Sequence, residues 1–164
     1  MADGVHEVLP TADGAVALTF DHEGVPLAHL QALEADGVAV LPPSKALHFA
    51  QDKLAMRVRL AELGLPVPDF ADLSGDRAAA RSRLIEFGEA NDWAIVVKAV
   101  RGGYDGRGVW LVDGADDALA VFDEYPDDAP ALLTEQKVPM RRELSAMIAR
   151  SPFGQGGAWP VVET

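Results

Sequence analysis

The feature that most constrains the fold is a glycine-rich segment, residues 101–108, that lies between two short apolar runs. The runs cover residues 94–100 and 108–112, and each has the length and composition of a β-strand. Two such runs joined by a short segment that contains Asp-Gly predict a β-hairpin. The segment has glycine at four of the seven positions 102–108. A hairpin turn needs fewer, so the loop is a candidate for a further role.

The loop has the composition of an anion-binding loop. Glycines allow backbone N–H groups to converge on phosphate oxygens without clashes of Cβ atoms, and Arg101 and Arg107 add positive charge. Lys98 lies shortly before the loop in an otherwise apolar run, and a buried ammonium group requires an anion or a carboxylate. An ordinary hairpin turn and a lysine that reaches water at a strand edge are the alternatives. The combination of lysine and loop favours phosphate binding.

The N-terminal part predicts a strand, a helix and a second strand. Residues 15–20 form a compact apolar run, Pro26 can open a helix that ends near Gly37, and residues 38–41 form a second apolar run. This order predicts a parallel crossover unit. Ser44 can then cap one helix that ends at Gly64. Its apolar face would consist of Leu47, Leu54, Val58 and Ala61.

The remainder of the chain alternates between helical and strand patterns. The pattern predicts a helix over residues 76–89, with Leu84, Ile85 and Phe87 as core candidates. It also predicts a short helix over residues 116–122 and strands over residues 131–135, 143–150 and 159–162. The fold class expected from these elements is therefore α/β.

Composition excludes several classes of function. The formal net charge of -12 argues against nucleic acid or an anionic membrane as a partner. The chain has no cysteine, which excludes disulfides and cysteine-based metal sites. We expect no metal site, because the four histidines lack the spacing of metal ligands. No apolar run is long enough to span a membrane, and the first residues do not resemble a signal peptide, so a cytoplasmic protein is expected.

A third segment, residues 135–139 followed by Glu143, is less specific. A strand that turns at Pro139 could expose backbone groups to the edge of an adenine ring, and a carboxylate at Glu143 could accept hydrogen bonds from ribose hydroxyls. An acidic loop on an acidic protein is the alternative. Spacing alone favours that alternative.

Together, three blocks of this sequence resemble one family of ATP-grasp enzymes, the 5-(carboxyamino)imidazole ribonucleotide synthases of purine biosynthesis. The string Gly-Gly-Tyr-Asp-Gly-Arg-Gly is specific to this family among ATP-grasp enzymes. The segment 19–26 also resembles the end of the family's N-terminal domain, so the resemblance runs from about residue 16 onward. The three blocks are residues 51–53 with 65–68, Lys98 with residues 102–108, and residues 135–138 with 142–150.

The resemblance implies an ATP-grasp module with a short Rossmann-like remnant before it. Residues 1–43 would be the remnant of the N-terminal domain, and residues 44–164 the nucleotide-binding region. The implied reaction is the ATP-dependent carboxylation of 5-aminoimidazole ribonucleotide with bicarbonate, so ATP, bicarbonate and that ribonucleotide are the implied partners. Mg²⁺ is the implied metal, and the family is often dimeric, which suggests a homodimer.

The resemblance also implies a role for each matching residue. Lys53 and Lys98 would contact the phosphates of ATP, and the loop from Gly103 would close over them. Glu143 would bind the ribose. The remaining implied contacts are Tyr104, Asp105, Gly106, Arg107 and Gly108 in the loop and Glu135, Gln136, Lys137 and Val138 at the adenine, with Tyr104, Asp105 and Arg107 also near the bicarbonate-derived group.

The sequence departs from the family pattern at both ends. The glycine-rich turn that helps relatives to bind the ribonucleotide has no counterpart here, and Gly24 stands where relatives often have Asn or His. The lobe that carries the family's magnesium ligands is expected to be missing, so we expect an incomplete copy with little turnover. Two alternatives stay open: another ATP-grasp ligase, and a nucleotide-binding fragment without catalysis.

Overall fold

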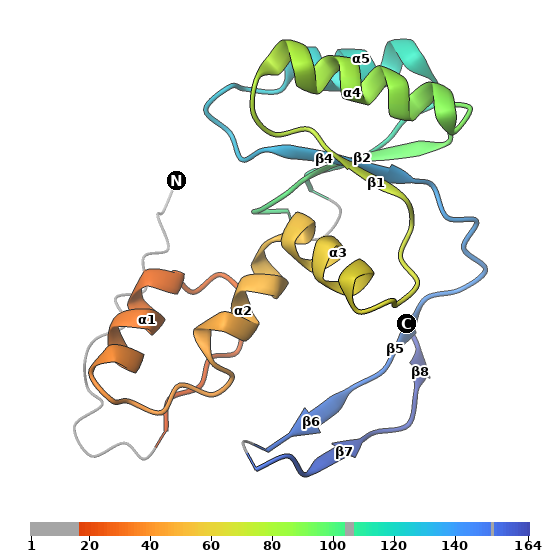
Figure 1. Ribbon diagram of the computed structural model, residues 1–164. Coiled ribbons are helices and arrows are strands. Elements are labelled where there is room, and N and C mark those ends of the chain that lie inside the picture. Colours follow the sequence, from red (N-terminus) through yellow and green to blue (C-terminus); the bar gives the residue numbers. More distant parts are fainter. Residues whose placement is uncertain (1–16, 104–106, 152) are drawn as a thin grey trace.

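The computed structural model describes residues 17–103, 107–151 and 153–164 (Figure 1). A four-stranded antiparallel sheet with the order β1-β4-β2-β3 forms its centre. Helices α4 and α5 cover one face of this sheet, and α3 lies against the other face (Figure 1). The bounds are Phe70–Asp72 for β1, Ile95–Ala99 for β2, Val109–Leu111 for β3, Leu132–Gln136 for β4, Lys53–Glu62 for α3, Arg77–Ala90 for α4 and Ala115–Glu124 for α5.

The alternation of side chains along β2 separates the two faces of the sheet. Ile95, Val97 and Ala99 pack into the core with residues of α4 and α5. Since successive side chains of a strand point to opposite faces, Lys98 faces α3. The predicted hairpin is confirmed, because β2 and β3 pair antiparallel with Lys98 opposite Val109.

Helix α4 forms where the sequence pattern predicts it. The Asp76 carboxylate caps the helix by accepting a hydrogen bond from the Ala79 amide at 2.9 Å. Leu84 is fully buried, whereas Ile85 and Phe87 are partly buried. The prediction of α5 is also confirmed, with two more residues at its C-terminal end.

A second, smaller core lies in the N-terminal part. Helix α1, Leu27–Ala35, and helix α2, Ser44–Gln51, pack around Leu30 and Leu47. The expected strands shrink to a single parallel bridge between Leu18 and Val40. The predicted direction of pairing is therefore confirmed, but strands of the predicted length are wrong; residues 15 and 16 lie outside the described part.

The predicted single helix from Ser44 to Gly64 is wrong, because the chain breaks it at Asp52. This residue has extended backbone angles, and its carboxylate caps α3 by accepting from the Ala55 amide at 2.8 Å. Ser44 does not cap α2 but is its first residue. Of the four predicted apolar positions Leu47 is buried and Leu54 half-buried, whereas Val58 and Ala61 are exposed.

The C-terminal part is a two-stranded ribbon that extends away from the sheet (Figure 1). Its inner pair joins β5 and β8, and its outer pair joins β6 and β7. The predicted strand over 143–150 is therefore interrupted, and the last predicted strand is displaced to both sides of Trp159. The bounds are Leu144–Ser145 for β5, Ile148–Arg150 for β6, Gly156–Ala158 for β7 and Val162–Glu163 for β8.

Candidate functional site

A buried carboxylate lies at the centre of the candidate site. Glu135, on β4, is 3% exposed and faces α3. Its Oε2 accepts from Nε of Arg57 at 2.8 Å, and its Oε1 accepts a hydrogen bond from the ammonium group of Lys98. Three elements, α3, β2 and β4, thus meet at one ionised group. The side chains of both cations retain about a fifth of their exposure, so they border the solvent.

Lys98 has the carboxylate partner that its sequence environment demands. Register explains the contact: Lys98 is opposite Leu133, which places Glu135 diagonally across from it on the same face. Burial lowers the pKa of Lys98, and the nearby positive charges of Arg57 and Lys53 lower it further. An anion bound beside Lys98 would oppose these effects, because a nearby negative charge favours the charged form of a lysine.

Helix α3 supplies two cations from one of its faces. Lys53 and Arg57 are four residues apart, which places both side chains on the same side of the helix. Lys53 begins the helix beside the glycine-rich loop, and Arg57 lies one turn further along, beside Glu135. The backbone amide of Lys53 donates to the carbonyl of Val100 at 2.9 Å and ties this end of α3 to the sheet.

The glycine-rich loop approaches this cluster through its backbone. A Cβ atom at Gly103 would lie 2.5 Å from the carbonyl oxygen of Arg107 and 3.4 Å from Nζ of Lys53. The first distance is too short for any side chain, so the fold requires glycine here. Gly108 has a φ of +67°, which also favours glycine. The predicted residues Tyr104, Asp105 and Gly106 lie outside the described residues.

An ion pair fastens the start of the loop to the start of α3. Oδ2 of Asp52 accepts from Nε of Arg101 at 3.0 Å and contacts its Nη2 at 2.8 Å. The other carboxylate oxygen caps α3. The described contacts thus pair three cationic side chains with two carboxylates in a protein of net charge -12. A fourth cation, Lys53, lies near enough to Lys98 for its charge to lower the pKa of Lys98. The members of this basic cluster are Lys53, Arg57, Lys98, Arg101, Asp52 and Glu135.

The segment predicted to hold adenine follows directly from this cluster. The Gln136 amide donates to the carbonyl of Asp69 and the Lys137 amide to that of Ala94, each at 2.8 Å. The chain therefore leaves the sheet only after Lys137. The predicted segment begins at Glu135, so its first residues still belong to the sheet. Val138 is exposed beyond that point. Glu143 is also exposed, and none of the described contacts joins it to the basic cluster.

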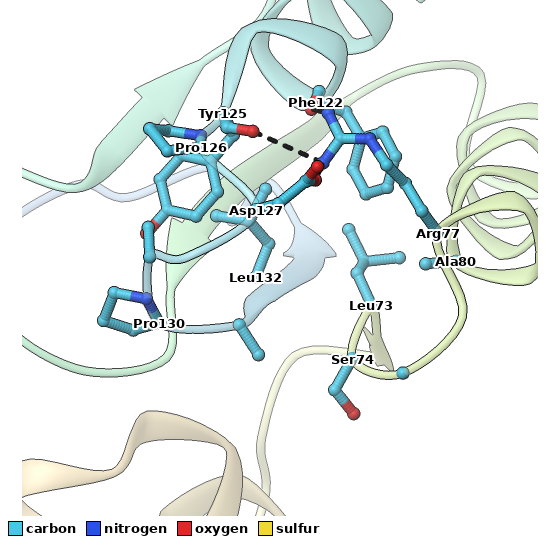
Figure 2. Close-up of a pocket in the computed structure, with 13 residues that line it drawn as sticks. Leu73, Ser74, Arg77, Ala80, Phe122, Tyr125, Pro126, Asp127, Pro130 and Leu132 are labelled. Atoms are coloured by element: carbon cyan, nitrogen blue, oxygen red, sulfur yellow. Dashed lines mark hydrogen bonds and ion pairs between the residues drawn. The ribbon is translucent and has the colours of Figure 1, made fainter.

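Two cavities of the described structure have cationic side chains in their lining. One, of about 290 Å³, borders the basic cluster and is lined by Lys53, Arg101 and the start of the glycine-rich loop. The other, of about 190 Å³, lies between α4 and α5 (Figure 2). There Arg77 donates to the carbonyls of Phe122 and Asp123 and to the Asp127 carboxylate, so its charge is used within the fold. The first cavity is the candidate for an anionic ligand.

The sequence pattern of the ATP-grasp domain matches residues 58–164. This match covers most of the chain. The chain belongs to the ATP-grasp family. The observed mixture of helices and strands agrees with that fold.

Several similar proteins carry the name N5-carboxyaminoimidazole ribonucleotide synthase. N5-carboxyaminoimidazole ribonucleotide synthase of Mycobacterium tuberculosis is 52% identical over 153 residues, which are 93% of this chain and 34% of that protein. The crystal structure of the corresponding synthetase from Thermus thermophilus is 29% identical, with a TM-score of 0.77 over 93% of this chain and 38% of that one.

A second similar structure contains ligands. The synthase from Aspergillus clavatus, in complex with ADP and 5-aminoimidazole ribonucleotide, has a TM-score of 0.73 at 22% identity, over 90% of this chain and 36% of that chain. That likeness concerns the fold. The chain spans about a third of the length of these relatives.

Sequence reasoning missed one member of the basic cluster, Arg57. The available signal was its spacing of four residues from Lys53 in a helical pattern. It also placed Asp52 only within a matching block, without its role as cap and ion-pair partner.

No described helix combines the length and apolar character that crossing a bilayer requires.

Proposed function

We propose that this chain supplies the ATP-binding region of an enzyme that carboxylates 5-aminoimidazole ribonucleotide. The full reaction uses ATP and bicarbonate and yields N5-carboxyaminoimidazole ribonucleotide, ADP and phosphate. The names of relatives at up to 52% identity support this reaction, and the Aspergillus clavatus structure with ADP and the ribonucleotide supports the pair of ligands. Purine biosynthesis in the cytoplasm is the corresponding setting.

The observation that carries the proposal is the basic cluster beside the glycine-rich loop. Triphosphate oxygens require cations and converging backbone N–H groups. Lys53 approaches the loop from α3, with its Nζ 3.4 Å from the position of a Cβ atom at Gly103. Its positive charge also lowers the pKa of Lys98 on β2, so the two ammonium groups lie near each other. In the proposed complex the two ammonium groups bind phosphate oxygens, while Arg57 keeps Glu135 neutralised.

The proposal extends the site beyond the described contacts. Residues 135–138 hold the adenine, partly through backbone groups, and Glu143 binds the ribose. Tyr104, Asp105 and Arg107 lie near the bicarbonate-derived group, and Gly103 to Gly108 border the phosphates. In this proposal residues 1–43 belong to a preceding domain and residues 44–164 to the ATP-grasp region, which includes the matched residues 58–164.

The proposed reaction has two steps, the activation of bicarbonate by ATP and the transfer of the carboxyl group to the ribonucleotide. A bicarbonate oxygen attacks the terminal phosphorus of ATP, ADP leaves, and the amine of the ribonucleotide then displaces phosphate from the activated carboxyl group. The cations of the basic cluster offset the negative charge that gathers on the phosphate oxygens. Mg²⁺ accompanies ATP in such reactions, but no group of three potential ligands exists among the described residues, so we assign no metal ligand to them.

Binding of nucleotide is the first test. Calorimetry should detect MgATP and MgADP binding to the chain, and Lys98→Met should weaken it by about tenfold or more, since loss of one partner of a close charge pair costs several kcal/mol. Lys45→Met is the matched control, because Lys45 is exposed on α2, away from the described basic cluster. Equal affinity of wild type and Lys98→Met would refute the assigned role of Lys98.

Substrate assays separate the remaining alternatives. Phosphate release that depends on 5-aminoimidazole ribonucleotide supports the proposed reaction. A different ATP-grasp ligase would bind MgATP with no response to that ribonucleotide. A nucleotide-binding fragment would bind MgATP and release no phosphate under any of these conditions. Sedimentation at the assay concentration tests for the homodimer that such enzymes often form.

A further inference from the structure

The junction between α2 and α3 contains a contact that the proposed function does not use. Asp52 ends α2 and begins α3, and its two carboxylate oxygens bind in different directions. Oδ1 accepts from the Ala55 amide at 2.8 Å, within α3. Oδ2 pairs with the Arg101 guanidinium, at 3.0 Å to Nε and 2.8 Å to Nη2. One side chain therefore joins the first turn of α3 to the residue that opens the glycine-rich loop.

We propose that Asp52 and Arg101 are positioning residues for phosphate binding, and that their ion pair holds Lys53 against the glycine-rich loop. This inference rests on the proposed nucleotide site. Lys53 directly follows Asp52, and its Nζ lies 3.4 Å from the position that a Cβ atom of Gly103 would occupy. A shift of the first turn of α3 would carry Lys53 away from the loop.

The position of α3 depends on polar contacts to an unusual degree. None of its ten residues is fully buried, and Val58, an expected core residue, is 42% exposed. Among the described residues, three polar contacts join it to β4, to the end of β2 and to the start of the loop. They are the Arg57–Glu135 pair, the hydrogen bond from the Lys53 amide to the Val100 carbonyl and the Asp52–Arg101 pair. Two of the three act on the first turn, so loss of the ion pair leaves one bond to orient Lys53.

Partial burial makes this ion pair more than a surface contact. The Asp52 side chain is 13% exposed and the Arg101 side chain is 46% exposed. The fork of the guanidinium fixes direction as well as distance, because two of its nitrogens meet the same oxygen. Arg101 also neutralises a carboxylate that would otherwise repel phosphate. The pair therefore combines a geometric and an electrostatic effect, which experiments can separate.

Asp52→Asn separates the two effects because they predict opposite results. Asparagine caps a helix as well as aspartate does, so α3 keeps its start. Simple electrostatics predicts tighter MgADP binding, since a negative charge beside Lys53 is removed. The positioning role predicts binding that is about five- to tenfold weaker, with adenosine binding unchanged because adenosine lacks phosphates. Unchanged or tighter MgADP binding by a folded Asp52→Asn variant would overturn the proposal.

A second set of variants keeps the test decisive if Asp52→Asn does not fold. Arg101→Gln should weaken MgADP binding by a similar factor, and Arg101→Lys should restore part of it by retaining the charge. The double variant Asp52→Asn/Arg101→Gln should bind no more weakly than the weaker single variant, because both remove the same contact. Additive losses would overturn the proposal.

The controls separate this inference from the proposed function. Arg59→Gln breaks a solvent-exposed ion pair with Glu62 on the same helix and should leave MgADP affinity unchanged. Thermal unfolding of each variant shows whether a loss of affinity follows a loss of folded protein. A wild-type chain that binds no MgADP would remove both the proposed function and this inference, whereas binding that Asp52→Asn leaves intact would remove the inference alone.

Discussion

Glu135 sets the charge balance of the candidate site. It is the most buried acidic side chain of the basic cluster, and it contacts cations from α3 and β2 at once. A buried carboxylate is costly unless it is paired and hydrogen-bonded. The same pairing keeps two cations close together, where they would otherwise repel each other. The residue therefore stabilises the fold and maintains a concentration of positive charge that an anionic ligand can use.

Glu135→Gln tests this role through stability. Removal of the charge leaves Arg57 and Lys98 partly buried and without their shared counter-ion, so the free energy of unfolding should fall by about 2–4 kcal/mol. Glu62→Gln is the matched control, since it breaks an exposed ion pair on α3 and should change stability by less than about 0.5 kcal/mol. Urea unfolding measures both. Equal effects of the two substitutions would contradict the assigned role of Glu135.

The sequence predicted the need of Lys98 for a partner but not which partner the fold would provide. A lysine in an apolar strand signals its requirement locally. The partner lies 37 residues away, and the contact depends on the register between β2 and β4. Local pattern carries little information about register, so the sequence did not identify the Glu135 side chain as the partner of Lys98 and Arg57.

At the scale of elements, regular patterns were predicted well and interruptions were not. The hairpin and α4 follow from local periodicity and capping residues. The break between α2 and α3 does not follow from them, because a single aspartate between two helical patterns hardly changes the local sequence pattern. Contacts of Asp52 with Ala55 and with the distant Arg101 fix the break. The interrupted C-terminal ribbon was missed for a similar reason, since an apolar run gives no sign of where pairing stops.

Arg77 joins two elements that cover the sheet. Its guanidinium donates to the carbonyls of Phe122 and Asp123 at 2.8 and 2.9 Å, near the end of α5. Figure 2 shows Arg77 beside Phe122. The guanidinium also lies 5.0 Å from the centre of the Phe122 ring. Hydrogen bonds from a charged donor satisfy the carbonyls that a helix end leaves unpaired.

Arg77→Met should therefore lower the free energy of unfolding by about 1–3 kcal/mol. Arg77→Lys should recover little of it, because a single ammonium group cannot reproduce the fork of the guanidinium. Arg59→Met, at an exposed position, serves as the control for loss of an arginine. Chemical denaturation gives the comparison. Full recovery by lysine would show that charge alone, without the fork, accounts for the contact.

The described structure has a well-packed central sheet and a C-terminal ribbon whose side chains are largely exposed. Of the exposed large hydrophobic side chains, most lie in residues 138–162, along the ribbon. A two-stranded ribbon without a covering layer has little stability of its own. The chain spans about a third of its relatives' length, and the ribbon is the part of the described structure with the least internal packing.

Hydrogen exchange should reveal this division. Backbone amides of β5, β6, β7 and β8 should exchange by local opening, much faster than those of β2 and β4, which exchange only when the sheet unfolds. Mass spectrometry of peptides from 144–163 and from 95–99 measures the difference in one experiment. MgADP should slow exchange near the basic cluster and leave the outer ribbon unchanged. Equal protection of ribbon and sheet would show that the ribbon has stabilising contacts of its own.

The weak packing of α3 has a consequence for how a ligand could be accommodated. A helix that packs on an apolar core can move only if close-packed contacts break, so it has essentially one position. The described contacts of α3 with the sheet and the loop are mainly ion pairs and hydrogen bonds. A bound polyanion can therefore take the place of a carboxylate in such a pair without opening a cavity. The position of α3 over this face of the sheet can therefore adjust through its ionic contacts. How firmly α3 is held should depend on the ionic strength of the solution.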